Sequence, residues 1–314
     1  MKGRRLAAAL LATALLALAG CSSTGPDTET DAGPDTGSPT GSPTGRPDTG
    51  RPRTDRPESG PARGGTPSPE RTTAPPGDGK RAGPWRPRPG TRWQWQLDGR
   101  VDTGVDVPVY DIDGFENEAR TVAELHARGR KVICYINAGA WESFRPDSSA
   151  FPASVLGRNN GWDGEKWLDI RRLDVLRPIM ADRIEMCRKK GFDAVEPDLT
   201  EGYRNNTGFP LTAAHQLAFN RMIARLAHDR GLSVGLKNDL EQIPELVADF
   251  DFAVNEQCAE HDECESLRPF VEGGKAVFHV EYELETGDFC REAGQLGLSS
   301  MRKRLGLDAW RKPC

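Results

Sequence analysis

Eight short apolar or β-branched runs alternate with segments of helical spacing in the second part of the chain. The runs cover residues 93–97, 107–113, 131–137, 192–198, 233–238, 250–257, 276–282 and, more weakly, 298–303. Helical patterns lie between several of them, at 119–128, 173–190 and 212–230, and Gly129, Gly191 and Gly231 stand where these helices should stop. Eight strands alternating with helices predict an α/β fold, a (β/α)8 TIM-type barrel. An open doubly wound sheet is the rival, but no Gly-rich phosphate loop follows an early run.

Polar side chains cluster at the carboxyl ends of these predicted strands. They are Asp111, Asp113, Tyr135, Asn137, Glu196, Asp198, Lys237, Asn238, Glu256, Gln257, Glu281 and Tyr282. In a parallel barrel the carboxyl ends of the strands converge on one mouth, which is where active sites lie. The sequence therefore predicts that these residues form a catalytic or substrate-binding site.

Carboxylates from two different strands suit glycoside hydrolysis. That reaction needs one carboxyl group to protonate the leaving oxygen and another to attack or to activate water. Glu196 and Asp198 are two residues apart on one strand, so both should face the pocket, and crowding would raise the pKa of one of them. Glu256 lies between two neutral amides on another strand. The alternatives are structural: Glu196 could pair with Lys237, and Glu256 could anchor a loop.

Aromatic and acidic residues outside the strand ends are further candidates for substrate binding. Trp141, Trp162, Trp167 and Tyr203 lie in segments expected to form the rim, where aromatic faces stack on sugar rings or attract an ammonium group. Asp111, Asp113 and Asp169 could bind protonated amines. Packing is the alternative for the aromatic residues, and helix capping or solvation is the alternative for the acids.

The N-terminus has the pattern of an exported lipoprotein. A basic start (Lys2, Arg4, Arg5) precedes an apolar stretch, 6–18, that is too short for a stable membrane span. Leu18-Ala19-Gly20-Cys21 fits a bacterial lipobox, so residues 1–20 are expected to be a signal peptide and Cys21 the lipidation site; an ordinary cleaved signal is the alternative. The chain is then expected at the bacterial cell surface, anchored to the membrane by lipid, or released.

Composition separates a linker from a folded domain. Residues 21–83 are rich in Pro, Gly, Ser and Thr and almost free of large apolar side chains, which predicts a disordered tether. Residues 84–314 are long enough for one barrel domain. The formal charge is −5, and removing Lys2, Arg4 and Arg5 leaves −8. Nucleic acid is therefore not expected as a partner, whereas a cationic ligand suits this charge.

Six cysteines remain when Cys21 is set aside from the seven in the chain. An even number in an exported domain predicts disulfides, and six cysteines allow fifteen pairings. We expect Cys258 with Cys264, Cys290 with Cys314, and Cys134 with Cys187. Strand alternation supports the third pair, because an inward Tyr135 turns Cys134 toward the helices. The chain has no Cys-x-x-Cys and its five histidines are scattered, so no metal site is expected.

A family resemblance rests on motifs that run in order from about residue 93 to 282. They are Trp93-Gln94-Trp95-Gln96-Leu97, Val109-Tyr110-Asp111-Ile112-Asp113, Lys131-Val132-Ile133-Cys134-Tyr135, Gly161-Trp162, Trp167-Leu168-Asp169-Ile170, Val195-Glu196-Pro197-Asp198, Gly235-Leu236-Lys237-Asn238, Val254-Asn255-Glu256-Gln257-Cys258 and Glu281-Tyr282. Together they resemble glycoside hydrolase family 114, the endo-α-1,4-polygalactosaminidase family.

The resemblance implies a barrel that cuts inside α-1,4-linked galactosamine polymers without a cofactor. It implies Asp198 as nucleophile and Glu256 as general acid/base, although the residues alone leave open whether Glu196 or Asp198 attacks. The expected partner is a polysaccharide containing galactosamine, and a monomer is expected. The chain departs from the family pattern at Leu199, where an amide is usual, and at Glu201, where Asp is usual. Another α-linked galactoside as substrate, or a non-catalytic polysaccharide-binding lipoprotein, are the alternatives.

Overall fold

The computed structural model describes residues 84–314. They fall within one of the two compact units of the chain, Ala74–Cys314. The expected signal peptide 1–20, the lipidation site Cys21 and the tether 21–83 lie outside the described residues. Within residues 84–314, none of the helices has the length and apolar character needed to cross a membrane.

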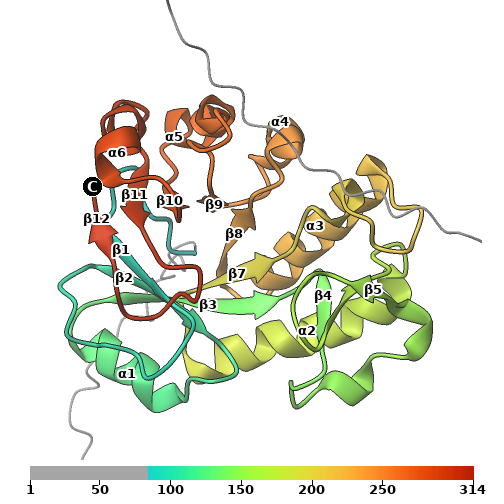
Figure 1. Ribbon diagram of the computed structural model, residues 1–314. Helices are drawn as coiled ribbons and strands as arrows, with labels where there is room; N and C mark the ends of the chain where they lie inside the picture. The colour runs from blue at the N-terminus through green and yellow to red at the C-terminus, as the bar shows by residue number, and fades with distance from the viewer. Residues whose placement is uncertain (1–83) are drawn as a thin grey trace, which may run out of the picture. The chain divides into compact units, whose positions relative to one another are not determined.

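Eight parallel strands form one curved sheet (Figure 1). In sheet order they are β1 (Trp93–Gln96), β2 (Val109–Asp113), β3 (Lys131–Asn137), β7 (Ala194–Asp198), β8 (Ser233–Lys237), β9 (Phe252–Glu256), β10 (Val277–Glu281) and β11 (Ser299–Arg302). A ninth strand, β12 (Lys312–Pro313), pairs antiparallel with β11. Each of the eight predicted runs contains one of the parallel strands, which confirms the α/β, TIM-type prediction.

The helices that cover the sheet follow the sequence pattern. They are α1 (Ala119–Ala127), α2 (Leu173–Lys190), α3 (Ala213–His228), α4 (Ile243–Leu246), α5 (Arg268–Glu272) and α6 (Thr286–Gln295). The first three correspond to the three predicted helices. Gly129, Gly191 and Gly231 follow them with φ of 73°, 91° and 75°, a left-handed conformation that glycine adopts without steric cost. Residues 84–314 also contain five short 3-10 turns: η1 (Ser148–Ala150), η2 (Ala153–Val155), η3 (Gly202–Arg204), η4 (Leu240–Gln242) and η5 (Cys264–Leu267).

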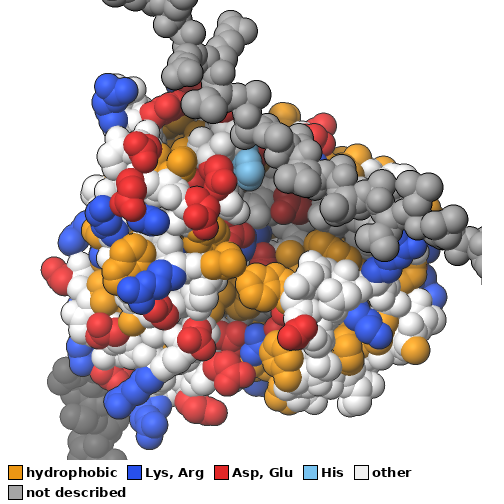
Figure 2. Space-filling model, viewed as in Figure 1, with side chains coloured by type: hydrophobic (Ala, Val, Ile, Leu, Met, Phe, Trp, Pro, Cys, Tyr) orange, Lys and Arg blue, Asp and Glu red, His pale blue; other side chains and the backbone are white. Residues whose placement is uncertain are grey.

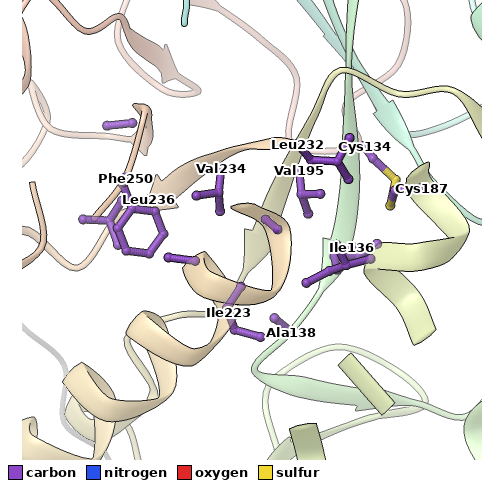
Figure 3. Close-up of a cluster of buried hydrophobic side chains, with 14 of the residues drawn as sticks. Cys134, Ile136, Ala138, Cys187, Val195, Ile223, Leu232, Val234, Leu236 and Phe250 are labelled. Carbon is purple, nitrogen blue, oxygen red and sulfur yellow. A yellow bond between two sulfur atoms is a disulfide. The ribbon is translucent and has the colours of Figure 1, made fainter. Parts of the chain in front are cut away.

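The two faces of the sheet bury different apolar clusters. The concave face encloses Trp93, Trp95, Ile133, Phe252 and Phe278. The other face packs against the helices, where Cys134 and Ile136 of β3, Val195 of β7, and Val234 and Leu236 of β8 meet Cys187 of α2 and Ile223 of α3 (Figure 3). This alternation is the period-2 pattern of strands that are buried on both faces.

The C-terminal segment fills the gap between β1 and β11. Strand pairing in the described residues does not join these two strands. Instead, the carbonyl of Leu307 accepts hydrogen bonds from the backbone N–H groups of Leu97 and Asp98, at 3.0 and 3.3 Å. The indole of Trp93 donates directly to the carbonyl of Ser299, at 2.8 Å. Figure 1 shows the segment after β11, in red, passing beside β1.

All three expected disulfides form. Cys134 of β3 bonds to Cys187 of α2, Cys258 to Cys264 in the loop after β9, and Cys290 of α6 to Cys314 at the end of the chain. Such bonds are typical of exported proteins. The last one ties down the segment that fills the β1–β11 gap.

An excursion between β3 and α2 was not expected from the sequence. It contains a three-stranded antiparallel sheet in the order β4 (Ala140–Glu142), β6 (Glu165–Leu168), β5 (Leu156–Asn159). The segment leaves the barrel at the carboxyl end of β3, so it lies at the mouth.

Candidate active site

The carboxyl ends of β3, β7, β8, β9 and β10 bring five predicted site residues into direct contact. Lys237 is at the centre, with Asp198 and Glu256 on either side of its ammonium group. Tyr135 and Tyr282 each bond to one of these carboxylates. Figure 2 shows Asp and Glu side chains gathered around a recess on the face viewed.

Lys237 bridges the two candidate catalytic carboxylates. Its Nζ lies 2.7 Å from Asp198 Oδ1, 3.0 Å from Glu256 Oε2 and 3.5 Å from Glu196 Oε1. The Lys237 side chain is 2% exposed, whereas Asp198 and Glu256 keep 16% and 23% of their side chains exposed. The ammonium also lies 4.9 Å from the centre of the Trp95 ring, a cation-π contact. A buried cation thus holds two carboxylates that remain open to solvent.

Asp198 is held in its ionised form. Burial alone would raise the pKa of Asp198, but the Lys237 charge and hydrogen bonds outweigh it and lower that pKa below its ordinary value. The bonds come from Lys237 to Oδ1, from the Leu199 N–H to Oδ1 at 2.8 Å, and from the Tyr135 hydroxyl to Oδ2 at 2.8 Å. An ionised carboxylate in a fixed orientation suits a nucleophile.

Glu256 has a different set of partners. The Tyr282 hydroxyl donates to its Oε1, and the Asn238 amide lies 3.5 Å from its Oε2. The Glu256 backbone N–H donates to Asn238 Oδ1 at 3.0 Å, which fixes the end of β9 against the end of β8. The predicted site residues Asn238 and Tyr282 therefore position the second carboxyl group.

The two carboxylates are close together. Because Lys237 Nζ contacts both, Asp198 Oδ1 and Glu256 Oε2 are at most 5.7 Å apart, the sum of 2.7 and 3.0 Å. Retaining glycosidases place their two carboxyl groups about 5 to 5.5 Å apart, and inverting enzymes about 6.5 to 9.5 Å. This upper limit is shorter than the separation in the inverting class.

Backbone strain marks the same strand ends. Leu199, Asn238, Asp239 and Gln257 have φ of 58°, 49°, 49° and 62°, and they directly follow the ends of β7, β8 and β9. Residues other than glycine rarely adopt this conformation, and it clusters at functional sites. Gly139 packs so tightly here that a Cβ on it would lie 1.8 Å from the Leu199 carbonyl oxygen.

Two more predicted residues lie deeper in the barrel. Asp111 of β2 and Glu196 of β7 are fully buried, and their carboxyl groups lie close enough together that each affects the pKa of the other. Burial first, and then the neighbouring Glu196, raises the pKa of Asp111 well above its ordinary value. Burial also raises the pKa of Glu196, to about 7, against the opposing effects of Lys237 and of the hydrogen bond from Asp111.

Three predicted acids have other partners. Both oxygens of Asp113 bind Arg145, at 3.1 and 2.6 Å, and Asp169 binds Arg171 in the same two-pronged way, at 2.7 and 2.8 Å. Glu281 is fully buried, bonded to His279 and to the Ala259 N–H, both at 2.8 Å. These acids hold the loops around the mouth.

The remaining predicted residues lie around the rim. Asn137 donates to Glu165 at 3.2 Å, the Tyr203 hydroxyl donates to Glu241 at 2.8 Å, and the Gln257 amide donates to Glu260 at 2.8 Å. Trp141 and Trp167 belong to the antiparallel sheet of the excursion, and Trp162 lies between β5 and β6. Trp162 is 55% exposed, whereas Trp167 is buried.

Three contributors to the site were not among the predicted site residues. Trp95 lies beside Lys237, and its place two residues after Trp93 on an alternating strand was the available signal. Glu165 bonds to Asn137 and its pKa is raised, mainly by burial. Glu201 accepts from Asn238 at 3.3 Å and lines a pocket of about 200 Å³ that also includes Glu256. Only tertiary structure reveals Glu165, because it comes from the excursion.

One group of three potential metal ligands lies within 4.8 Å among residues 84–314: Cys258, Cys264 and His279. Both sulfur atoms belong to the disulfide, and the His279 nitrogens bond to Ser300 and Glu281. The two sulfur atoms and both imidazole nitrogens therefore already have partners.

Known proteins resemble this chain over most of the described residues. The model for glycoside-hydrolase family GH114 matches residues 76–314. A crystal structure of Ega3 from Aspergillus fumigatus in complex with galactosamine is 41% identical, with a TM-score of 0.71 and coverage of 74% of this chain and 98% of that one.

Two further proteins are similar to this chain at lower sequence identity. The glycoside hydrolase domain of PelA from Pseudomonas aeruginosa is 13% identical, with a TM-score of 0.57 over 71% of this chain and 98% of that one, which is a likeness of fold. An uncharacterized protein of Deinococcus radiodurans is 27% identical over 202 residues, which is 57% of this chain. The match spans 64% of that relative, just under two thirds of its length.

Proposed function

Because this chain belongs to glycoside-hydrolase family GH114, we propose that it cleaves internal α-1,4-galactosaminide bonds of an amino-sugar polysaccharide. The observation that carries the proposal is the pair of partly exposed carboxylates, Asp198 and Glu256, on either side of one buried lysine. Two carboxyl groups at this spacing are what hydrolysis of a glycosidic bond requires.

The proposed chemistry is a two-step displacement. Glu256, in its protonated form, donates its proton to the glycosidic oxygen while Asp198 attacks the anomeric carbon, which gives a covalent glycosyl-enzyme and releases the leaving sugar. Glu256 then takes a proton from water, and that water displaces Asp198 from the anomeric carbon. The anomeric configuration is retained, in accord with the separation of at most 5.7 Å between the two oxygens.

The charge around the mouth supports a cationic substrate. Glu201, Glu256 and Glu263 line one pocket, which also contains Arg204 and His261. Carboxylates attract the ammonium groups of deacetylated galactosamine units. The printed ligand of Ega3, galactosamine, supports the same substrate class here.

Anchoring is part of the proposal and rests on the sequence alone. The lipobox ending at Cys21 and the tether 21–83 would hold the domain at the cell surface, clear of the membrane, as a monomer. Exported proteins of this kind form disulfides, which accords with the three in the domain.

A second candidate is a hydrolase for another α-linked galactoside. The leucine at position 199, beside the proposed nucleophile, favours it, because an apolar side chain there changes the polarity of the site. The test is mass spectrometry of the products from deacetylated, N-acetylated and neutral α-1,4-linked galactoside oligomers. Shortening of the amine-bearing oligomers supports the proposal, and shortening of neutral oligomers alone supports the second candidate. Binding without shortening would indicate a polysaccharide-binding protein.

A further inference from the structure

Two buried carboxyl groups below Lys237 have no role in the displacement just described. Asp111 and Glu196 have no exposed surface. Among the described residues, no N–H or hydroxyl group donates to any of their four oxygens. Two ionised carboxylates in contact, without donors, would be extremely costly in a site that excludes water.

A shared proton removes this cost. The two buried carboxyl groups interact with each other, and a hydrogen bond can join them only if one of them is protonated. Glu196 is the member nearer to the cation, because its Oε1 lies 3.5 Å from Lys237 Nζ. The negative charge of the pair is therefore most stable on Glu196, and the proton on Asp111.

We propose that Asp111 donates a shared proton to Glu196, and that this carboxyl pair positions the Lys237 ammonium beneath Asp198 and Glu256. The second half of the proposal rests on the proposed function, since it gives Asp111 and Glu196 a part in that reaction as positioning residues. The first half, the shared proton, holds whatever the substrate is.

The balance of charge explains why the proton matters. The groups that face Lys237 are the carboxylates Asp198, Glu256 and Glu196 and the neutral Trp95 ring; Asp111 faces Glu196 from β2. A fourth anion would draw the ammonium down, away from the mouth. A neutral Asp111 leaves Lys237 shared between the two carboxylates that face the substrate.

Melting temperatures of the full chain test the shared proton. We compare the parent with Asp111→Asn, which keeps the shape and supplies an amide donor to Glu196, at pH values from 4 to 8. A buried acid that keeps its proton loses stability, relative to an amide, as the pH rises above the pKa of the unfolded state. The melting temperature of Asp111→Asn minus that of the parent should therefore rise by at least about 4 °C across this range.

The opposite slope would overturn the shared proton. If Asp111 were ionised in the folded protein, the same difference would fall as the pH rises, and a flat difference would equally show that no proton is held there. Glu196→Gln gives a second measurement if Asp111→Asn does not fold. Below about pH 7 the pair holds a second proton, on Glu196, and above it only the shared proton remains, so the difference from the parent should rise up to about pH 7 and then level off.

The pH dependence of kcat/KM on galactosamine oligomers tests the positioning role. In the parent, kcat/KM should change in a step near pH 7. Glu196→Gln should abolish this step and Asp111→Asn should keep it, whatever the turnover number of each variant. Profiles that differ only by a constant factor would mean that the pair is merely structural. If the parent cleaves nothing, the proposed function fails, and the melting temperatures still decide the shared proton.

Discussion

The Nζ of Lys237 lies 2.7 Å from Oδ1 of Asp198, at the base of the mouth. The same nitrogen lies 3.0 Å from Glu256, so a single buried charge sets both the spacing and the ionisation of the two proposed catalytic groups. The pKa of Asp198 is lowered from its ordinary value of 3.8, so Asp198 is expected to take up a proton only at a pH below that value. The acid limb of kcat/KM should accordingly lie below pH 3.8.

Lys237→Met should remove the charge that keeps the pKa of Asp198 low. The side chain keeps its length but loses its charge, so the pKa of Asp198 rises and the acid limb should move up by about 1 to 3 pH units. Loss of one partner from a buried ion pair should also reduce kcat/KM by roughly a hundredfold or more. Lys131→Met is the matched control, since Lys131 pairs with Asp193 at the opposite end of the sheet, 2.6 Å away. An unchanged acid limb in Lys237→Met would contradict the role of this lysine.

Tyr135→Phe should also raise the pKa of Asp198, but by less than Lys237→Met does. The Tyr135 hydroxyl donates to Asp198 Oδ2, and a hydrogen bond to a charged group contributes about 1.5 to 3 kcal/mol. Its loss should raise the acid limb by about one pH unit. Tyr110→Phe is the control, because the Tyr110 hydroxyl donates only to backbone carbonyls, those of Asp102 and Val105. The pH profile of kcat/KM is measured for both variants. If the acid limb moved equally in Tyr135→Phe and Tyr110→Phe, the hydrogen bond from Tyr135 would not be what lowers the pKa of Asp198.

Leu199→Asn should stabilise the protein. Leu199 has a φ of 58°, and the left-handed conformation costs most side chains about 1 to 2 kcal/mol, whereas asparagine tolerates it. The melting temperature should rise by about 2 to 4 °C. Leu305→Asn changes an exposed leucine without this strain and should leave the melting temperature nearly unchanged. A lower melting temperature in Leu199→Asn would show that the leucine side chain contributes more than the strain costs.

Removing the Cys290–Cys314 disulfide should destabilise the barrel where β1 meets β11. The bond closes a loop with a sequence separation of 24, for which the chain-entropy contribution is about 3 kcal/mol. The Cys258–Cys264 bond has a separation of 6 and should contribute less, about 2 kcal/mol. Denaturant unfolding of the two double Cys→Ser variants compares them. A larger loss from the shorter loop would contradict the tie between the C-terminal segment and the sheet.

The sequence predicted the strands well because most of the parallel strands are buried on both faces, whereas β11, which matches the weakest predicted run, is buried on one. Strands buried on both faces appear as short apolar runs, and alternation along β3 also predicted the Cys134–Cys187 bond. The antiparallel sheet of the excursion was missed because β4, β5 and β6 have three or four residues each and mix apolar with charged side chains, as in Lys166 beside Trp167.

The candidate site was predicted in outline, and alternation explains the exceptions. Glu281 and Tyr282 are adjacent, so they point to opposite faces of β10; Tyr282 joins the interior cluster and Glu281 faces outward. Asn238 follows Lys237 yet still reaches the mouth, because its positive φ turns the chain. That Lys237 bridges Asp198 and Glu256 depends on the stagger between β7, β8 and β9, which no pattern within one strand contains.

The most direct measurement is the rate at which the full chain shortens partly deacetylated α-1,4-galactosamine oligomers, followed by mass spectrometry of the products. The parent is compared with Asp198→Asn and Glu256→Gln, and with Asp193→Asn and Glu185→Gln as controls away from the mouth. The account predicts shortening by the parent and both controls, and a loss of roughly a thousandfold or more in each of the first two variants. Shortening that survives both Asp198→Asn and Glu256→Gln would contradict the assignment of the catalytic carboxylates.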